Sequence, residues 1–367
     1  MIKAWDGETI RFFLIVFLCT LQSIYFYNIS LAPFPILSLL FLFQKNPKFT
    51  KADLTIALLL ASIVVVNMFF FPLFLLEGSF YFQTTLGFFV GLIYFLLLHN
   101  YLRKIKLSSI IFAINLSLII HVAFFSSQFI YYIITGEHLD FIVGITGEVT
   151  RNLNHLGIIR SSGLFIEPQN YSFYVLALIY LKYHLTSNYS DTISLVSLLT
   201  VVLSFSLFGI LGASVFYFLI FRKVISKWII ILILLVGIYF TYDYYLFIYE
   251  TRLTSLSSDG SFLARFAQPF LQLFSEPNYL LLGKGFGIIG TSFNELSTLL
   301  SILTSFGLFL GSIFISIILY SVMFRHGINK YISYSLLIFI LLMDLRISMM
   351  FFWLMFGLIS FKNFKNE

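Results

Sequence analysis

Twelve apolar runs, each almost free of charged residues, dominate this chain and limit the folds open to it. A transmembrane helix needs roughly 20 consecutive apolar residues, and most of the runs approach that length. Some are shorter, so tilted spans, half-helices or a merged pair are compatible with them. The pattern predicts an all-α integral membrane protein with about twelve transmembrane helices in one membrane domain, residues 1–367. The runs are 12–28, 30–43, 53–76, 80–98, 107–134, 168–185, 192–206, 208–222, 227–248, 296–324, 330–343 and 346–361.

The composition excludes a soluble fold. Only 10% of the residues are charged, whereas soluble domains carry roughly 25%. A very large soluble core is the alternative, but no soluble fold of this length hides so many uncharged runs. The first run resembles a signal peptide, yet no small-residue cleavage site follows it, so we expect it to be retained as a span. Cys19 lies inside that run and is the only cysteine, which excludes a disulfide framework and a thiolate metal site.

The distribution of Lys and Arg predicts the orientation. If the N-terminus is cytoplasmic, 16 of the 22 Lys and Arg residues fall on the cytoplasmic side. The positive-inside rule therefore favours an even number of spans with both termini in the cytoplasm. The net charge of +6 is explained by topology and requires no nucleic-acid partner. The six that remain outside are Arg151, Arg160, Arg252, Arg265, Lys284 and Arg346.

Two long loops, 136–167 and 249–295, are external in this topology and are the segments where polar chemistry can take place. Four of their five Lys and Arg residues are Arg. The planar guanidinium binds phosphate or carboxylate through paired hydrogen bonds, which favours an anionic, lipid-linked ligand. A solvated, acidic external face is the alternative explanation. The five residues are Arg151, Arg160, Arg252, Arg265 and Lys284.

Several polar residues in these loops have competing explanations. Glu167 precedes Pro168 at a predicted helix start, where an acid and a proline suit the first turn without any catalytic role. The glycines around Lys284 form either a tight turn without a ligand or a weak phosphate-binding pattern. No strand precedes them, so a Rossmann or Walker site is excluded. Neither loop has a paired-carboxylate metal motif, and the histidines other than His155 are scattered without ligand spacing, so no metal site is predicted.

The segment Arg160-Ser-Ser-Gly163-Leu-Phe-Ile-Glu167-Pro168 resembles the R-x-x-G-x-F-x-E-P element of bacterial O-antigen polymerases, relatives of the O-antigen ligases. The run Leu282-Gly-Lys-Gly-Phe-Gly287, with Asn294-Glu295 and the following apolar stretch, is similar to the end of their second periplasmic loop. The turn Leu203-Ser-Phe-Ser-Leu-Phe-Gly209 is similar to their mid-chain S-x-S/T-G turn. The likeness covers the organisation of the whole chain, although each motif is short.

This resemblance implies a metal-independent glycosyltransferase of the GT-C type in the bacterial inner membrane, without a cofactor. The enzyme would transfer a growing glycan from undecaprenyl diphosphate to a lipid-linked repeat unit at the periplasmic face. Arginines would neutralise the diphosphate leaving group, and a carboxylate would orient the acceptor hydroxyl. We assign catalysis to Glu167, Arg160, Arg265 and Arg252, and substrate binding to Arg151, Lys284, Asn294, Glu295 and His155.

Three other functions are open. An O-antigen ligase shares the chemistry, but related ligases carry a histidine near the position of Asn294 and Glu295, which is absent here. A lipid-linked oligosaccharide flippase should show two similar halves, and this sequence has no internal repeat. A non-catalytic partner of an assembly complex should tolerate changes at Arg160 and Glu167. A chain-length regulator and a flippase are the protein partners that the resemblance implies, besides membrane lipids.

Overall fold

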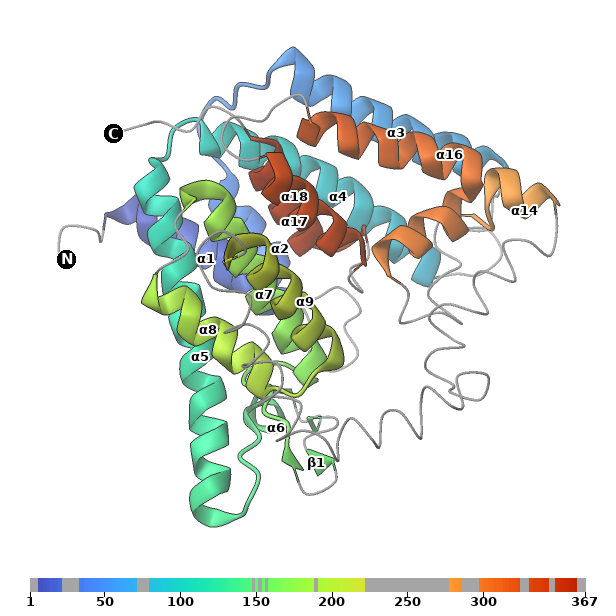
Figure 1. Ribbon diagram of the computed structural model, residues 1–367. Coiled ribbons are helices and arrows are strands. Elements are labelled where there is room, and N and C mark those ends of the chain that lie inside the picture. The colour runs from blue at the N-terminus through green and yellow to red at the C-terminus, as the bar shows by residue number, and fades with distance from the viewer. Residues whose placement is uncertain are drawn as a thin grey trace.

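The computed structural model describes residues 6–21, 33–70, 79–146, 149–150, 154–155, 158–187, 191–221, 277–285, 297–323, 330–342 and 347–361, and most of them are helical (Figure 1). A two-residue antiparallel pair, β1 (Asn154–His155) with β2 (Ile158–Ile159), lies between α6 and α7. The helices are α1 (Gly7–Thr20), α2 (Pro33–Leu42), α3 (Lys51–Phe70), α4 (Ser79–Leu102), α5 (Leu107–Thr135), α6 (Phe141–Thr146), α7 (Pro168–Thr186), α8 (Thr192–Leu203), α9 (Leu207–Phe221), α14 (Pro277–Leu282), α16 (Thr298–Met323), α17 (Lys330–Leu342) and α18 (Met350–Ser360).

Helices occupy the predicted apolar runs wherever the structure describes them, while the run 227–248 lies outside the described residues. Within the described ranges, four helices are long and apolar enough to cross a membrane: α3, α4 from Phe82 onward, α5 and α16. The protein is therefore an α-helical membrane protein, as the sequence predicts. The span count of about twelve and the orientation of the termini stay predictions.

Helices α7 and α18 form the centre of the bundle. Every residue of α18 is buried, and so are most residues of α7. Around α7 lie α5, α8, α9, α17 and α18, and α18 also contacts α4, α16 and α1 (Figure 1). A helix that is apolar on all sides belongs in the core of a large helical protein, which explains why these two sequences lack an amphipathic face.

Large apolar side chains point away from the bundle on the outer helices. Leu58 and Phe69 of α3 are 67% and 83% exposed, and Phe309 of α16 is 60% exposed. Such residues are favourable against lipid tails and unfavourable against water. The outer faces of α3 and α16 therefore fit a lipid environment.

Helix ends that carry basic residues gather at one end of the bundle. Arg11 at the start of α1 donates to the carbonyls of Phe41 and Phe43 at the end of α2. The Tyr101 hydroxyl, near the end of α4, donates to the Glu8 carbonyl at 3.2 Å. We call this the basic end; it consists of the start of α1, the end of α2, the start of α3 and the end of α4.

Local sequence signals set several helix boundaries. Asp6 caps α1 by accepting the Thr9 backbone N–H at 2.7 Å, so this helix begins before the apolar run that contains it. Hydrogen bonds from Thr9 hold the pKa of Asp6 below its ordinary value. Gly136 ends α5 in the left-handed conformation at a φ of 73°, as is common for a helix C-terminus.

Helix α16 is interrupted at Gly307, where the backbone takes a φ of 72°. The segment after α14 enters this break, and the backbone N–H groups of Lys284 and Gly285 donate to Thr304 and Ser305 at 2.8 and 3.1 Å. The predicted run 296–324 is thus helical but not continuous. The donated hydrogen bonds satisfy carbonyl groups that the break leaves without intrahelical partners.

Candidate functional site

The segment from Arg160 to Pro168 connects β2 to α7 and is mostly buried. Ser161, Ser162 and Phe165 have no exposed surface. Loops usually run over a protein surface, because buried backbone groups need hydrogen-bond partners. This segment is therefore packed inside the protein, and the hydrogen bonds and contacts that fix it determine where its two ends lie.

Gln128 of α5 anchors this segment. Its side-chain oxygen accepts the backbone N–H groups of Ser162 and Gly163 at 2.7 and 3.0 Å. Its side-chain nitrogen donates to the Leu139 carbonyl at 2.7 Å. One buried amide thus joins the helix to two distant points of the 136–167 loop. An amide can do this because it carries an acceptor and two donors on one rigid group.

Gly163 brings the segment into direct contact with the α5 backbone. Its φ is +59°, in the left-handed region, and a Cβ at this position would lie 3.3 Å from the Phe125 backbone nitrogen. Phe165 then packs between helices, with its ring centroid 5.1 Å from that of His121 and 5.2 Å from that of Tyr174. The glycine and the phenylalanine of the R-x-x-G-x-F-x-E-P element therefore both have structural roles.

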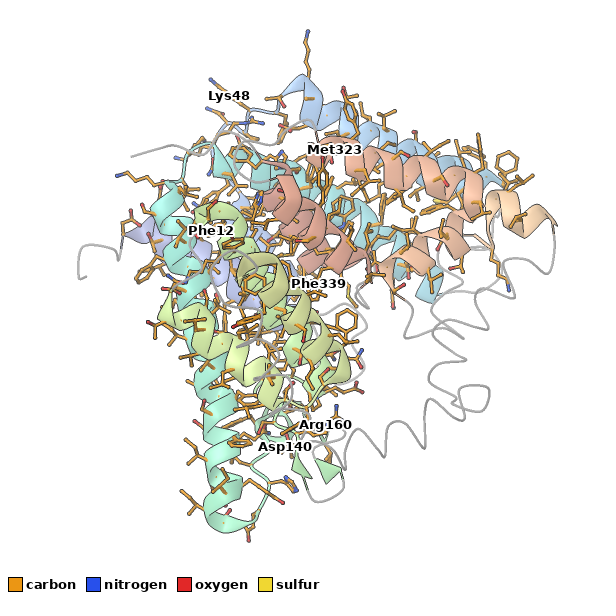
Figure 2. The ribbon with its side chains drawn as sticks, viewed as in Figure 1. Phe12, Lys48, Asp140, Arg160, Met323 and Phe339 are labelled. Carbon is orange, nitrogen blue, oxygen red and sulfur yellow. The ribbon has the colours of Figure 1, made fainter. Side chains whose placement is uncertain are left out.

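Arg160 and Glu167 mark the two ends of this buried stretch, and both are partly exposed. Glu167 is the N-cap residue of α7, with Pro168 at the first helical position, as the sequence predicts; its side chain makes no capping hydrogen bond. Figure 2 shows Arg160 at the end of the molecule that also holds Asp140, α6 and β1. A cation and an acid thus flank one rigid, buried segment.

Asp140 organises the first part of the same loop. It accepts the backbone N–H groups of Ile142 and Thr150 at 2.9 and 2.7 Å and the Thr150 hydroxyl at 2.6 Å. It therefore stabilises the start of α6 and ties this helix to the chain that leads into the β hairpin. Arg160 follows that hairpin directly, so its position depends on a folded loop.

The turn between α8 and α9 lies beside the first turns of α7. The hydroxyls of Ser172 and Ser204 are 2.7 Å apart, and the Tyr171 hydroxyl lies 2.6 Å from that of Thr200. A Cβ on Gly209 would come within 2.5 Å of the Ser172 hydroxyl oxygen. The segments 160–168 and 203–209, which resemble two separate polymerase motifs, are thus both joined to the start of α7.

Three buried polar atoms near this segment have no hydrogen-bond partner in the described part of the chain: the hydroxyl oxygens of Ser161 and Ser162 and Nδ1 of His121. Nε2 of His121 lies 2.8 Å from the Thr20 hydroxyl. Buried polar groups rarely lack partners in native proteins. Hydroxyls without partners beside Arg160 are consistent with water or a polar ligand group at this place.

Lys284 lies elsewhere in the fold. It lies two residues after the end of α14, which Figure 1 shows on the side of the molecule away from β1 and α6. Gly283 allows the backbone there to approach the break in α16, which supports the structural explanation for this glycine. Arg151, Arg252, Arg265, Asn294 and Glu295 lie outside the described residues, and His155 is described only as backbone of β1.

An apolar groove of about 650 Å³ lies between α3 and α16. It is lined by Ala52, Thr55, Leu59 and Ile313, among others. Ala52 and Thr55 belong to the first turns of α3, so the groove extends to the start of this helix. No lining residue belongs to the 160–168 segment, and the groove is therefore separate from the candidate site.

Sequence reasoning missed two features. Gln128 lies within an apolar run, where a lone amide suggests a buried hydrogen-bonding role. The second feature is an ionic cluster at the basic end, formed by Asp53, His99 and Arg103. The sequence pattern Thr50-x-x-Asp53 at the start of α3 is typical of a helix cap and could have indicated a structural role for Asp53. His99 lies in the last turn of α4, and Arg103 directly follows the end of this helix.

No protein-family model, curated protein or solved structure matches this chain. Within the ranges that the structure describes, no three His, Cys, Asp or Glu side chains lie close enough together to hold a metal ion.

Proposed function

We propose that this protein is a polysaccharide polymerase of the bacterial inner membrane. In this proposal it transfers a growing glycan from undecaprenyl diphosphate to a lipid-linked repeat unit at the periplasmic face, without a metal. One observation carries the proposal: two short segments that resemble polymerase motifs, 160–168 and 203–209, both pack at the start of α7. Arg160 and Glu167 flank the first of them.

The proposed reaction joins the acceptor hydroxyl to the anomeric carbon of the donor sugar. The bond between that carbon and the diphosphate oxygen breaks, and the lipid diphosphate leaves with the bonding electrons. The proton of the acceptor hydroxyl passes to a base, for which Glu167 is our candidate. Negative charge develops on the diphosphate, and Arg160 is placed at the same segment to stabilise it. Arg252 and Arg265 are the further candidates from the second loop.

Rigid support is what such chemistry requires of the protein. Gln128 fixes the middle of the segment, and Gly163 and Phe165 pack it against α5. Since misplacement of a catalytic group by about 1 Å costs on the order of 100-fold in rate, a segment held at several points suits a catalytic role. A loop that served only as a connection would not need this burial.

Complementation tests the proposal. A host that lacks its own polymerase, but has the cognate repeat-unit pathway, receives wild-type protein, Arg160→Ala, Arg160→Lys, Arg265→Ala or Glu167→Gln at matched membrane levels. Surface polysaccharide is then separated by gel. We expect a ladder for the wild type and a single repeat for Arg160→Ala, Arg265→Ala and Glu167→Gln. Arg160→Lys should be impaired as well, because an ammonium cannot make the paired hydrogen bonds of a guanidinium.

Two substitutions of exposed charged residues serve as controls for non-specific effects on folding and expression. Glu137→Gln removes an exposed acid from the same loop, and Lys104→Gln removes an exposed cation from the basic end. Both variants should keep the wild-type ladder. A wild type without a ladder, or site variants that all retain it, would overturn the proposal in favour of a flippase or a non-catalytic assembly partner. Transfer to lipid A core without polymerisation would instead identify a ligase.

A further inference from the structure

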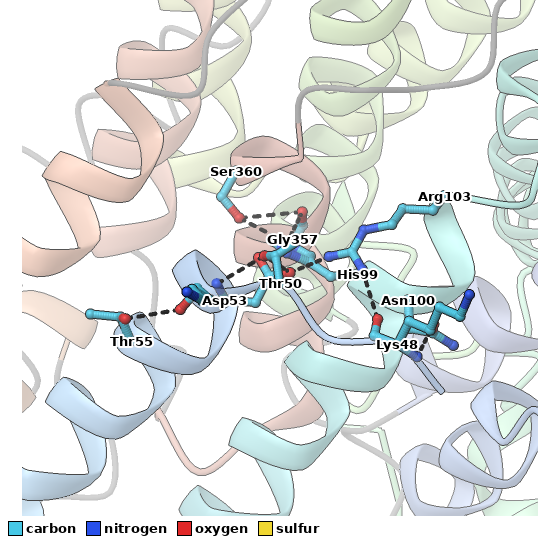
Figure 3. A network of polar contacts seen from close by, with 10 residues as sticks. Lys48, Thr50, Asp53, Thr55, His99, Asn100, Arg103, Gly357 and Ser360 are labelled. Atoms are coloured by element: carbon cyan, nitrogen blue, oxygen red, sulfur yellow. Dashed lines mark hydrogen bonds and ion pairs between the residues drawn. The ribbon is translucent and has the colours of Figure 1, made fainter. Parts of the chain in front are cut away.

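A buried ionic cluster joins three helices at the basic end (Figure 3). Asp53 lies in the first turn of α3 and is 1% exposed. The Thr50 hydroxyl donates to its Oδ2 at 2.6 Å, and the guanidinium of Arg103, the residue after α4, binds the same oxygen. Nδ1 of His99, also on α4, lies 2.8 Å from Oδ1. The proposed transfer reaction uses none of these residues.

The partners of Asp53 determine the role of the first histidine nitrogen. A carboxylate that accepts from a guanidinium and a hydroxyl is in its ionised form, since those donors stabilise the negative charge. An ionised carboxylate has no proton to donate. Nδ1 of His99 therefore carries the hydrogen of this contact and donates it to Asp53.

The second histidine nitrogen faces the end of α18. Nε2 lies 3.0 Å from the Gly357 carbonyl oxygen and 3.1 Å from the Ser360 hydroxyl. A carbonyl oxygen can only accept, so a favourable contact requires a hydrogen on Nε2 as well. The Ser360 hydroxyl donates to the same carbonyl at 3.4 Å, which leaves its oxygen able to accept. Both ring nitrogens thus face acceptors, as an imidazolium requires.

The end of α18 favours a cation for two further reasons. Phe361, directly after the helix, is extended with a ψ of 128°, so the last turn needs hydrogen-bond donors from outside the helix. The carboxyl end of a helix also carries partial negative charge, which stabilises a positive side chain there. Among the described residues of α18 no side chain is ionisable, so His99 supplies the charge from α4.

We propose that His99 is a buried imidazolium that caps the end of α18, and that this proton holds α18 against α3 and α4. Among the described residues, the ionisable groups of the cluster around the ring are Asp53 from α3 and Arg103 from the turn after α4. Rings of Phe95 and Phe361 cover it, with centroids 4.2 and 5.4 Å away. Loss of the proton would place a nitrogen lone pair against the Gly357 carbonyl oxygen and remove the cap. The inference is independent of the glycosyltransferase proposal.

A neutral His99 is the competing state, and it makes a different demand on Ser360. Neutral Nε2 would have to accept a hydrogen bond from the Ser360 hydroxyl, which would then be unable to donate to Gly357. Ser360→Ala separates the two states. An imidazolium keeps its bond to Gly357 in this variant, whereas a neutral ring loses the hydrogen bond that the Ser360 hydroxyl would donate to Nε2.

Nitrogen NMR of the full-length, histidine-labelled protein in lipid nanodiscs tests the proposal. The spectra are recorded at about pH 7, which is close to the pH at which unperturbed histidines titrate. His99→Gln assigns the signal; if that variant does not fold, the signal that Ser360→Ala shifts assigns it. We expect both ring nitrogens of His99 to be protonated in the wild type and in Ser360→Ala. A ring nitrogen without a proton would overturn the proposal. Asp53→Asn should lose the second proton, and its persistence there would contradict the role of the carboxylate.

Thermal unfolding of the same samples gives a second readout. Because the proton stabilises the folded state, the unfolding temperature of the wild type should fall as the pH rises from about 6 to about 9, across the range where histidine loses its proton. Ser360→Ala should retain that fall with little change at about pH 6. If Ser360→Ala lowers the unfolding temperature at every pH, and the unfolding temperature of the variant does not fall with rising pH as the wild type does, the ring of His99 is neutral.

Discussion

Gly283, after α14, and Gly307, in the break of α16, pack backbone to backbone, and a Cβ atom on either would overlap the other. Both have a positive φ, 76° and 72°. Asn67 of α3 closes the junction by donating to the carbonyls of Leu282 and Ser305 at 3.0 and 3.3 Å. Three segments far apart in the chain thus depend on two glycines.

Gly283→Ala should destabilise the protein by about 2–5 kcal/mol, because left-handed strain of about 1–2 kcal/mol adds to overpacking of about 1–3 kcal/mol. Thermal unfolding in detergent measures the change. Gly7→Ala is the matched control: its φ is not in the left-handed region and a Cβ there meets open space. A Gly283→Ala variant as stable as Gly7→Ala would show that this junction is not formed as described.

Gly163→Ala should cost more stability than Gly136→Ala. Both glycines have a positive φ, +59° and +73°, but only Gly163 has the α5 backbone within reach of a Cβ. The Gly136 variant measures the conformational strain alone, about 1 kcal/mol. The difference between the two unfolding free energies therefore reports the contact with Phe125. Equal costs would mean that the segment is not held closely against α5.

Gln128→Ala should loosen the 160–168 segment. The change leaves the backbone N–H groups of Ser162 and Gly163 buried without their acceptor, at about 1–3 kcal/mol for each group. Limited proteolysis of the purified protein should show faster cleavage in residues 136–167, and the polysaccharide ladder should weaken. Ser127→Ala, on the exposed side of the same helix turn, is the control. Unchanged cleavage would contradict the anchoring role of Gln128.

The ion pair of Lys182 with Asp191 predicts an acid-dependent loss of stability. Partial burial raises the pKa of Asp191, but hydrogen bonds from Lys182 and Ser194 and the Lys182 charge outweigh it, so the pKa lies below its ordinary value. The stability from this group is complete above the unfolded pKa of about 3.9 and is lost as the pH falls through the lower, folded value.

Asp191→Ser separates the charge from the cap. Asp191 also caps α8 by accepting the Ser194 N–H at 3.0 Å, and serine is an equally good capping residue. We expect the variant to lose about 1–3 kcal/mol near neutral pH, because Lys182 stays buried without its counter-ion. The stability difference from the wild type should shrink in acid. A difference that stays constant down to about pH 3, below the unfolded pKa, would contradict the ion pair.

The sequence by itself determined the class of fold and the place of most described helices, whereas α6 and α14 lie in segments that it predicted as loops. Uncharged apolar runs can hide their backbone only as helices in a membrane, and Asp6, Gly136 and Pro168 mark helix ends through local chemistry. Arg160 and Glu167 are predicted as site residues because the segment between them resembles the R-x-x-G-x-F-x-E-P element, and their catalytic roles stay predictions.

Only the tertiary structure decided which of these residues come together. The joining of the 160–168 and 203–209 segments at α7 depends on contacts such as Ser172 with Ser204, which no sequence period specifies. The break at Gly307 forms because a distant segment supplies its hydrogen bonds. The Asp53, His99 and Arg103 cluster arises where the ends of α3, α4 and α18 meet. Contacts between distant segments are set by packing, and packing is not a local property of the chain.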